Sequence, residues 1–174
     1  NPSLNTQHKV LAHFMGYELL HPSINIDPSP SLRIADIGTG TGIWLDRLSS
    51  TLPTNQPHHL QGFDISDRQF SKGSKNIHFC LHDATEPFPS EHLNSYDIVH
   101  VRLFVFALKE MDLGRVMANV VHLLRPGGYF QWEDADFCYT APAPAPDKPT
   151  PQVREIIDLV TTYAVKAGFS MRVS

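Results

Sequence analysis

The chain has 174 residues, 41% of them hydrophobic, and its 18 acidic and 14 basic residues give a formal net charge of -4. This length fits one domain with a hydrophobic core, and the acidic balance without a run of Lys and Arg argues against a nucleic-acid partner and for a small molecule. No apolar stretch has the length of a membrane span and no signal-peptide pattern opens the sequence, so we expect a cytoplasmic protein without membrane contact.

Residues 1–30 are expected to form a helical segment ahead of the main domain. Apolar residues recur near helical spacing over 4–20, and the prolines of HPSINIDPSPS end any helix beyond that point. The main α/β domain is expected over 31–140. A proline-rich connection and a last helix are expected over 141–174.

The stretch IADIGTGTGIW (34–44) predicts the end of a buried strand, a glycine turn and the start of a helix. Glycines at alternate positions let a ligand lie against main-chain N–H groups. The spacing is G-x-G-x-G, whereas the dinucleotide fingerprint needs a third glycine where Ile43 stands, and no Gly-Lys-Ser/Thr of a phosphate loop follows. Asp36, just before the turn, suits a cationic ligand better than a pyrophosphate. A cofactor cradle is predicted, and a nicotinamide cofactor is disfavoured.

The second strand is expected within HHLQGFDIS (58–66), which ends in an acid, Asp64. An acid at the carboxyl end of this strand is placed to accept hydrogen bonds from ribose hydroxyls, which predicts an adenosine-bearing ligand. His58 and His59, which open the stretch, have no further ligand at metal spacing and are expected to be solvated loop residues.

Three more strands and one helix follow. The third strand is expected over 76–84, with alternating apolar residues, Leu81 among them, on one side. The fourth lies within 96–108 and is expected to be buried on both faces. An amphipathic helix over 112–124 is predicted to end at the turn RPGG, and the fifth strand, GYFQWEDADF, begins after it.

Taken together, these motifs resemble those of the class I S-adenosylmethionine-dependent methyltransferases. The resemblance is carried by DIGTGTG, the strand end GFD, HDATEPFP (82–89) and LLRPGGYFQWED (123–134). The opening QHKVLAHFMGYELLHPSI (7–24) is similar to small-molecule methyltransferases of fungal secondary-metabolite pathways. The resemblance implies a Rossmann-like, doubly wound and mostly parallel sheet, here without its last two strands. It also implies S-adenosyl-L-methionine as cofactor and S-adenosyl-L-homocysteine as product.

The resemblance assigns the cofactor residues. In the family, the acid matching Asp83 accepts a hydrogen bond from the adenine amine, and the N–H of the next residue, Ala84, reaches a ring nitrogen. The main chain near Val101 and the side chain of Arg102 meet the methionine part. Alternatively, Asp83 only initiates a turn, and Arg102 pairs with Asp36 or Asp97. The cofactor set is Asp36, Gly38, Thr39, Gly40, Gly42, Asp64, Ile65, Asp83, Ala84, Val101 and Arg102.

Substrate contacts are expected from the N-terminal helix and from the ends of the fourth and fifth strands. The candidates are Met15, Tyr17, Phe104 and Trp132, and ordinary core packing is the alternative for each. A general base would help an alcohol or phenol acceptor, and the candidates for it are His8, His21 and Glu133.

The predicted reaction is methyl transfer to an O, N or S atom of a small molecule. Alignment and exclusion of water can supply most of the catalysis, because the leaving group is already good. A non-catalytic or regulatory relative that keeps the cofactor fold is the alternative. Cys80 and Cys138 lack metal spacing and are expected to be reduced thiols, so no metal is predicted. The identity of the acceptor and the oligomeric state are left open by these patterns.

Overall fold

The computed structural model describes residues 2–27, 31–71, 76–104 and 107–134. They fall into two compact units, one built from residues up to Arg102 together with Arg115–Trp132, the other containing Leu103–Gly114 with Glu133 and Asp134. The predicted linker and last helix over 141–174 lie outside the described residues.

The first unit alternates strands with helices or short turns. Its strands are β1 (Arg33–Ile37), β2 (His59–Asp64), β3 (Ile77–Leu81) and β4 (Tyr96–Arg102), and β5 (Leu124–Glu133) follows, its last residue in the second unit. The α-helices are α1 (Pro2–Met15), α2 (Ile43–Ser49) and α3 (Leu113–Val121), of which α3 begins in the second unit. Short 3-10 turns are η1 (Asp67–Gln69), η2 (Ser90–His92) and η4 (Glu110–Asp112).

The five strands form one sheet in the order β3-β2-β1-β4-β5. Parallel register is defined for β1 with β2, β1 with β4, and β2 with β3. The chain moves outward from β1 to β3 and then returns to the other side of β1, so the strand order reverses between β1 and β4. In open parallel sheets, ligands bind outside the carboxyl ends of the strands at such a switch point.

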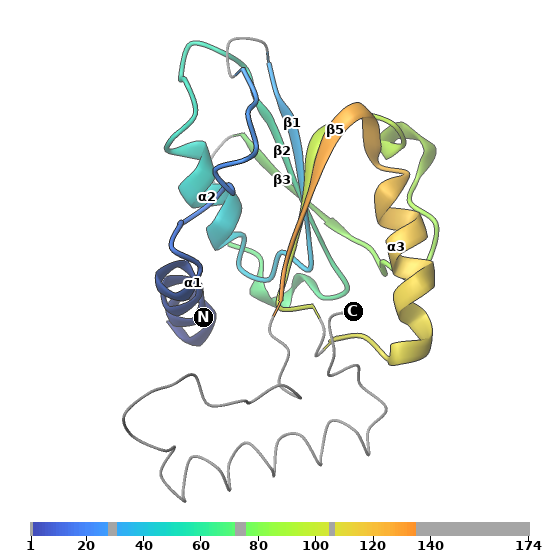
Figure 1. The fold of residues 1–174 in the computed structure, drawn as a ribbon. Coiled ribbons are helices and arrows are strands. Elements are labelled where there is room, and N and C mark those ends of the chain that lie inside the picture. The colour runs from blue at the N-terminus through green and yellow to red at the C-terminus, as the bar shows by residue number, and fades with distance from the viewer. Residues whose placement is uncertain (1, 28–30, 72–75, 105–106, 135–174) are drawn as a thin grey trace, which may run out of the picture. The chain divides into compact units, whose positions relative to one another are not determined.

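Helices cover both faces of this sheet. Figure 1 shows α1 and α2 on one side and α3 on the other. β1 and β4 are almost entirely buried, as expected of strands covered on both faces. The core between sheet and α2 is built from Ile34, Trp44, Leu45, Leu60 and Ile98, among others, each at most 1% exposed. The doubly wound, Rossmann-like sheet predicted from the sequence is confirmed for β1 to β5. The predicted absence of two further strands concerns residues outside the described part.

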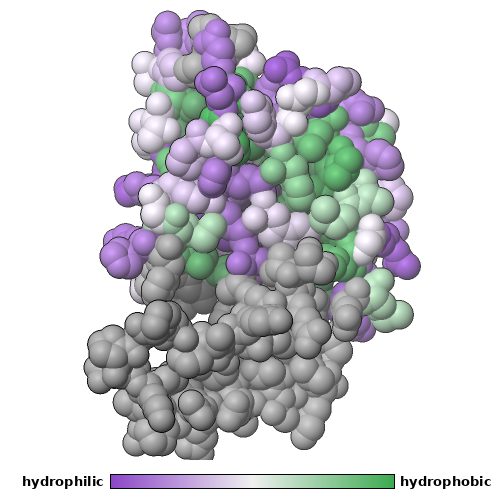
Figure 2. All heavy atoms as spheres, in the orientation of Figure 1, coloured by the Kyte–Doolittle hydropathy of each residue, from purple (hydrophilic) through white to green (hydrophobic). Residues whose placement is uncertain are grey.

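The surface mixes polar and apolar residues. Figure 2 shows hydrophobic patches among hydrophilic residues on the face in view. Large exposed hydrophobic side chains are Met15, Ile65, Leu81, Leu93, Met111 and Val121. None of the helices within the described ranges is long and apolar enough to cross a membrane.

Three expectations about local structure were wrong. The first helix ends at Met15 instead of residue 20, because Gly16 takes a left-handed conformation with φ of 75°. β5 begins before RPGG, since Leu123 O already accepts the N–H groups of Ser95 and Tyr96.

The third wrong expectation concerns the paired histidines. His58 is buried, not solvated: its Nδ1 accepts the N–H of Leu32 at 3.2 Å and its Nε2 contacts Pro53 O at 3.1 Å. His59 is the first residue of β2 and pairs with Arg33. His58 therefore joins Leu32, the residue before β1, to Pro53 in the loop before β2.

Candidate functional site

The glycine turn joins β1 to α2 at the switch point of the sheet. The N–H groups of Gly38 and Thr39 both donate to Phe63 O, at 2.9 and 3.0 Å, and Gly42 N–H donates to Thr39 O at 2.9 Å. Gly40 N–H donates to Asp64 Oδ2 at 2.8 Å. These four N–H groups are satisfied by the protein itself. What the turn offers a ligand is therefore a backbone without side chains at its three glycines, more than a row of donors.

Gly42 combines a left-handed backbone conformation with a close neighbour, so that a side chain does not fit there without strain. Its φ is 74°, and a Cβ built on it would lie 2.5 Å from Cζ of Phe79. An L side chain at this position would therefore be strained and would push the Phe79 ring away. Gly42 also caps α2 in this left-handed conformation, so the start of the helix depends on it.

Asp36 is buried beneath the turn and has two partners. Its Oδ2 accepts from Thr39 Oγ1 at 2.7 Å, and its Oδ1 lies 2.7 Å from Nδ1 of His100 on β4. Because a carboxylate only accepts, His100 donates from Nδ1. The His100 ring is fully buried and stacks on Trp44 of α2, with centroids 3.8 Å apart and an interplanar angle of 2°. Asp36 thus ties the turn to β4, and its predicted effect on a cationic ligand stays a prediction.

Asp64 lies at the carboxyl end of β2, directly across from the turn. Besides Gly40 N–H, its carboxylate accepts Ser66 N–H at 3.1 Å. Ile65, the next residue, is 69% exposed, which is unusual for a large apolar side chain and places it at the edge of the same strand end. The cofactor roles of Asp64 and Ile65 stay predictions.

Asp83 follows the carboxyl end of β3. Its Oδ1 accepts both the N–H of Thr85 at 2.9 Å and Thr85 Oγ1 at 2.8 Å. These hydrogen bonds hold the pKa of Asp83 below its ordinary value, so the side chain stays an acceptor near neutral pH. The turn-forming role considered for Asp83 is present, and it leaves Oδ2 outside both contacts. Ala84 is buried, and its carbonyl accepts from Asn119 of α3 at 3.0 Å.

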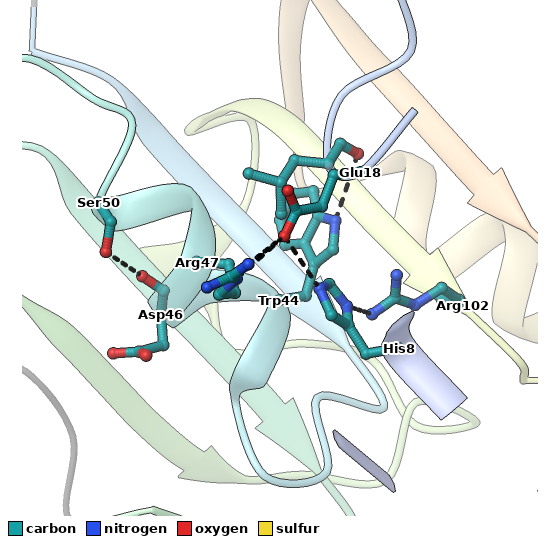
Figure 3. A network of polar contacts seen from close by, with 8 residues as sticks. His8, Glu18, Trp44, Asp46, Arg47, Ser50 and Arg102 are labelled. Carbon is teal, nitrogen blue, oxygen red and sulfur yellow. Dashed lines mark hydrogen bonds and ion pairs between the residues drawn. The ribbon is translucent and has the colours of Figure 1, made fainter. Parts of the chain in front are cut away.

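Arg102 ends β4, one residue after the buried Val101. Its Nη2 lies 2.6 Å from Nδ1 of His8, which comes from α1 and is only 3% exposed (Figure 3). The two alternative partners of Arg102 have other contacts: Asp36 binds Thr39 and His100. Asp97 accepts the N–H of Arg33 at 2.7 Å and pairs with Arg125 at 2.5 Å.

The N-terminal segment is fastened to this end of the sheet at further points. Asn5 Oδ1 accepts from Thr41 Oγ1 of the glycine turn at 3.1 Å. Glu18 Oε1 pairs with Arg47 Nη2 of α2 at 2.6 Å, as Figure 3 shows. Arg47 holds the pKa of Glu18 below its ordinary value, first by hydrogen bonding and then by its charge.

The predicted substrate residues of the N-terminal segment are partly accessible. Met15 is 39% exposed, and the ring of Tyr17 meets that of His21 edge-on at 5.2 Å. His21 is itself exposed, with Nδ1 2.6 Å from Ser23 Oγ. Its backbone N–H donates to Gln131 Oε1 of β5 at 2.9 Å, which holds this segment beside the sheet. The substrate and base roles of these residues stay predictions.

Trp132 lies on β5, where its ring meets Phe130 edge-on at 6.0 Å. In the second unit, Leu103 takes a φ of 51° and donates to Glu133 O, and Phe104 N–H donates to Asp134 Oδ2, both at 2.9 Å. Glu133 is 5% exposed. The roles of Trp132, Phe104 and Glu133 at a substrate stay predictions. Across the described ranges, no group of three or more His, Cys, Asp and Glu side chains is arranged to hold a metal ion.

Two residues of this region were missed from the sequence. His100 and Asn5 bind Asp36 and Thr41, yet neither was assigned a role at the site. His100 could have been found, because a histidine within the apolar run YDIVHV needs a buried partner and Asp36 is a buried acid on a central strand. Asn5 lies 36 residues from Thr41 in the sequence, and no local pattern relates the two.

Residues 34–128, from β1 into β5, match the family described as a methyltransferase domain. The chain belongs to this family. The resemblance noted in the sequence is thereby confirmed: the chain is a class I methyltransferase domain, and S-adenosyl-L-methionine is the cofactor that such domains use.

Several fungal methyltransferases are similar in sequence to this domain. Methyltransferase grgD of a Penicillium species is 40% identical over 176 residues, covering 98% of this chain and 60% of the relative. N-methyltransferase tcpN of Claviceps purpurea is 32% identical over 78% of this chain and 49% of its own length. N-methyltransferase gliN of Aspergillus fumigatus is 30% identical, over 80% and 48%. The methyltransferase domain described here spans about half the length of these relatives.

Solved structures share the fold at lower identity. A putative S-adenosylmethionine-dependent methyltransferase from Listeria monocytogenes has a TM-score of 0.53 at 15% identity, covering 75% of this chain and 57% of that one. Phosphoethanolamine N-methyltransferase 1 of Haemonchus contortus has a TM-score of 0.52 at 19% identity, covering 71% and 25%. Both confirm the arrangement of strands and helices.

Proposed function

We propose that this methyltransferase domain binds S-adenosyl-L-methionine at the carboxyl ends of β1, β2 and β3 and serves methyl transfer to an O, N or S atom of a small molecule of fungal secondary metabolism. The observation that carries the proposal is the geometry of the switch point, where the glycine turn after β1 is followed along the sheet by acids at the carboxyl ends of β2 and β3. Asp64 is joined to that turn through Gly40, and Asp83 follows β3, the neighbour of β2.

Each part of the cofactor has a matching feature in the chain. Asp64 is offered to the ribose hydroxyls, Ile65 to one face of the adenine, and Oδ2 of Asp83 to its exocyclic amine. The turn residues from Gly38 to Gly42 lie against the methionine part, whose carboxylate suits the guanidinium of Arg102. The cofactor supplies an electrophilic methyl group on a good leaving group. The chain therefore needs to align the acceptor and exclude water more than to provide strong acids or bases.

The class of acceptor follows from the relatives and from charge. Two of the similar proteins are named N-methyltransferases, so a nitrogen acceptor is the first class to test. The net charge of -4 favours a small molecule over a nucleic acid. A cytoplasmic location and the division into a helical segment (1–30), a cofactor core (31–140) and a C-terminal segment (141–174) belong to the same proposal. Neither the described residues nor the comparisons favour the non-catalytic alternative.

The test is titration calorimetry with S-adenosyl-L-homocysteine, run beside NAD. We expect micromolar binding of S-adenosyl-L-homocysteine and none of NAD. Asp64→Ala should weaken that binding about tenfold or more, because it removes both the ribose acceptor and the partner of Gly40 N–H. Asp67→Ala is the matched control, since it removes an exposed acid three residues away in η1. Preferred binding of NAD, or equal effects of the two substitutions, would contradict the proposal.

A further inference from the structure

We propose that His8 is a positioning residue that fastens α1 over the cofactor site by holding Arg102, and that it does so only while its imidazole is neutral. The part of this inference that concerns the cofactor rests on the function proposed above. His8 then serves the site by holding another side chain, in place of the base role considered for it from the sequence.

The contact between the two side chains fixes the protonation state of His8. A guanidinium has only donors, so at 2.6 Å from Arg102 Nη2 the Nδ1 atom of His8 must accept. A neutral imidazole can do this with its hydrogen on Nε2. An imidazolium cannot, because both of its nitrogens are donors.

His8 acts together with a second contact from the same helix. Asn5 lies one helical turn before His8 and binds Thr41 of the glycine turn at 3.1 Å. Thr41 follows β1 and Arg102 ends β4, two strands that lie side by side with Ile37 opposite Val101. α1 is therefore fastened to both strands that flank the switch point. Leaving that position requires the helix to break both contacts.

The charges around His8 decide what a proton would do. Arg102 faces Nδ1 from β4, and Glu18, in the segment after α1, lies 3.9 Å from Nε2. Arg47 of α2 already pairs with Glu18 at 2.6 Å, and both of those side chains are about half exposed, at 52% and 50%. Arg102 lies nearer to the His8 ring than Glu18 does, and Glu18 is more exposed to solvent. A charge on His8 would therefore be repelled by Arg102 more strongly than it is attracted by Glu18. Burial of His8 also disfavours a charge.

Proton uptake by His8 therefore breaks the contact with Arg102. The contact between α1 and Arg102 requires the neutral His8 ring. Release of α1 from the sheet is therefore coupled to binding of a proton by His8, and acid favours the released helix. An imidazole in water gains its proton below a pH of about 6.5. The affinity for the cofactor should fall in that range, because Arg102 loses its contact with His8 at the end of β4.

The first test measures the affinity for S-adenosyl-L-homocysteine from pH 8 to pH 5.5 by titration calorimetry. In the unsubstituted chain we expect affinity to fall about tenfold as His8 gains its proton, the loss of one charge-assisted hydrogen bond. In His8→Gln, whose amide oxygen can still accept from Arg102, the affinity at pH 8 should be kept and the fall should vanish. In His8→Ala it should be weak at both ends of the range. His13→Gln, an exposed histidine of the same helix, is the matched control and should keep the fall.

The second test needs no cofactor. Amide hydrogen exchange of α1 should be faster in His8→Ala than in His8→Gln at one fixed pH, while exchange within β4 stays equal and shows that the fold is intact. Equal exchange of α1 in the two variants would overturn the fastening role. The same fall of affinity with pH in His8→Gln as in the unsubstituted chain would overturn the role of the proton. Failure of the unsubstituted chain to bind S-adenosyl-L-homocysteine at pH 8 would instead overturn the proposed function, and the exchange result would still decide the fastening.

Discussion

The glycine turn and the N-terminal helix both lie against the end of the sheet where the cofactor is expected, but they are held there differently. The turn is tied down by four of its own N–H groups and by the fully buried pair of Asp36 and His100. The described side chains of α1 hold it through single contacts, such as Asn5 with Thr41 and His8 with Arg102. Segments with few buried contacts open at low cost, whereas buried networks open only with the core. We therefore expect the glycine turn to stay fixed under conditions in which α1 can move away from the sheet.

The largest effect is expected from the buried pair of Asp36 and His100 beneath the glycine turn. His100→Leu leaves the carboxylate of Asp36 buried with one partner fewer and removes the stack on Trp44, so it should cost about 3–5 kcal/mol of unfolding free energy. His100→Asn, whose amide can still donate to Asp36, should cost clearly less. Urea unfolding followed by circular dichroism measures both. Equal losses in the two variants would mean that cavity formation, and not the hydrogen bond, governs this site.

A smaller effect is expected at Gly42, where the glycine turn requires a left-handed backbone conformation. Gly42→Ala must accept a left-handed φ and displace the Phe79 ring, at a cost of about 1–3 kcal/mol. Gly114→Ala is the control: it is a helical position with no atom within 4 Å of the new Cβ, and it should be neutral or stabilising by up to about 1 kcal/mol. The comparison uses thermal unfolding of both variants. A Gly42→Ala protein as stable as Gly114→Ala would show that the turn can relax.

The smallest effect is expected at the exposed ion pair of Glu18 and Arg47, which joins the segment after α1 to α2. Glu18→Gln removes the pair with Arg47, but both side chains are about half exposed to solvent, where such pairs contribute little. The midpoint of unfolding should stay within experimental error, at low and at high salt. A clear drop in the midpoint would show that the N-terminal segment unfolds together with the core. The N-terminal helix and the glycine turn would then not differ in how firmly they are held.

Much of the fold could be predicted because its signals are local. The strands β1, β2 and β4 are short apolar runs bounded by turn residues, and the turn between β1 and α2 is marked by its glycines. Each of these patterns lies within a few consecutive residues and indicates one type of structure. The misses occurred where a neighbour elsewhere in the chain overrides the local pattern. β5 starts early because Leu123 pairs with the backbone at Tyr96, and His58 is buried because it binds Leu32.

The sequence by itself determined the family, the cofactor class and the strand ends that carry Asp64 and Asp83, because these depend on residue spacing within short segments. Only the tertiary structure decided which side chains meet. His8 and Arg102 are 94 residues apart, and Asp36 and His100 are 64 apart. Contacts at such separation are set by strand register and helix placement, and a hydrogen bond between two polar side chains leaves no mark in the residues around either one.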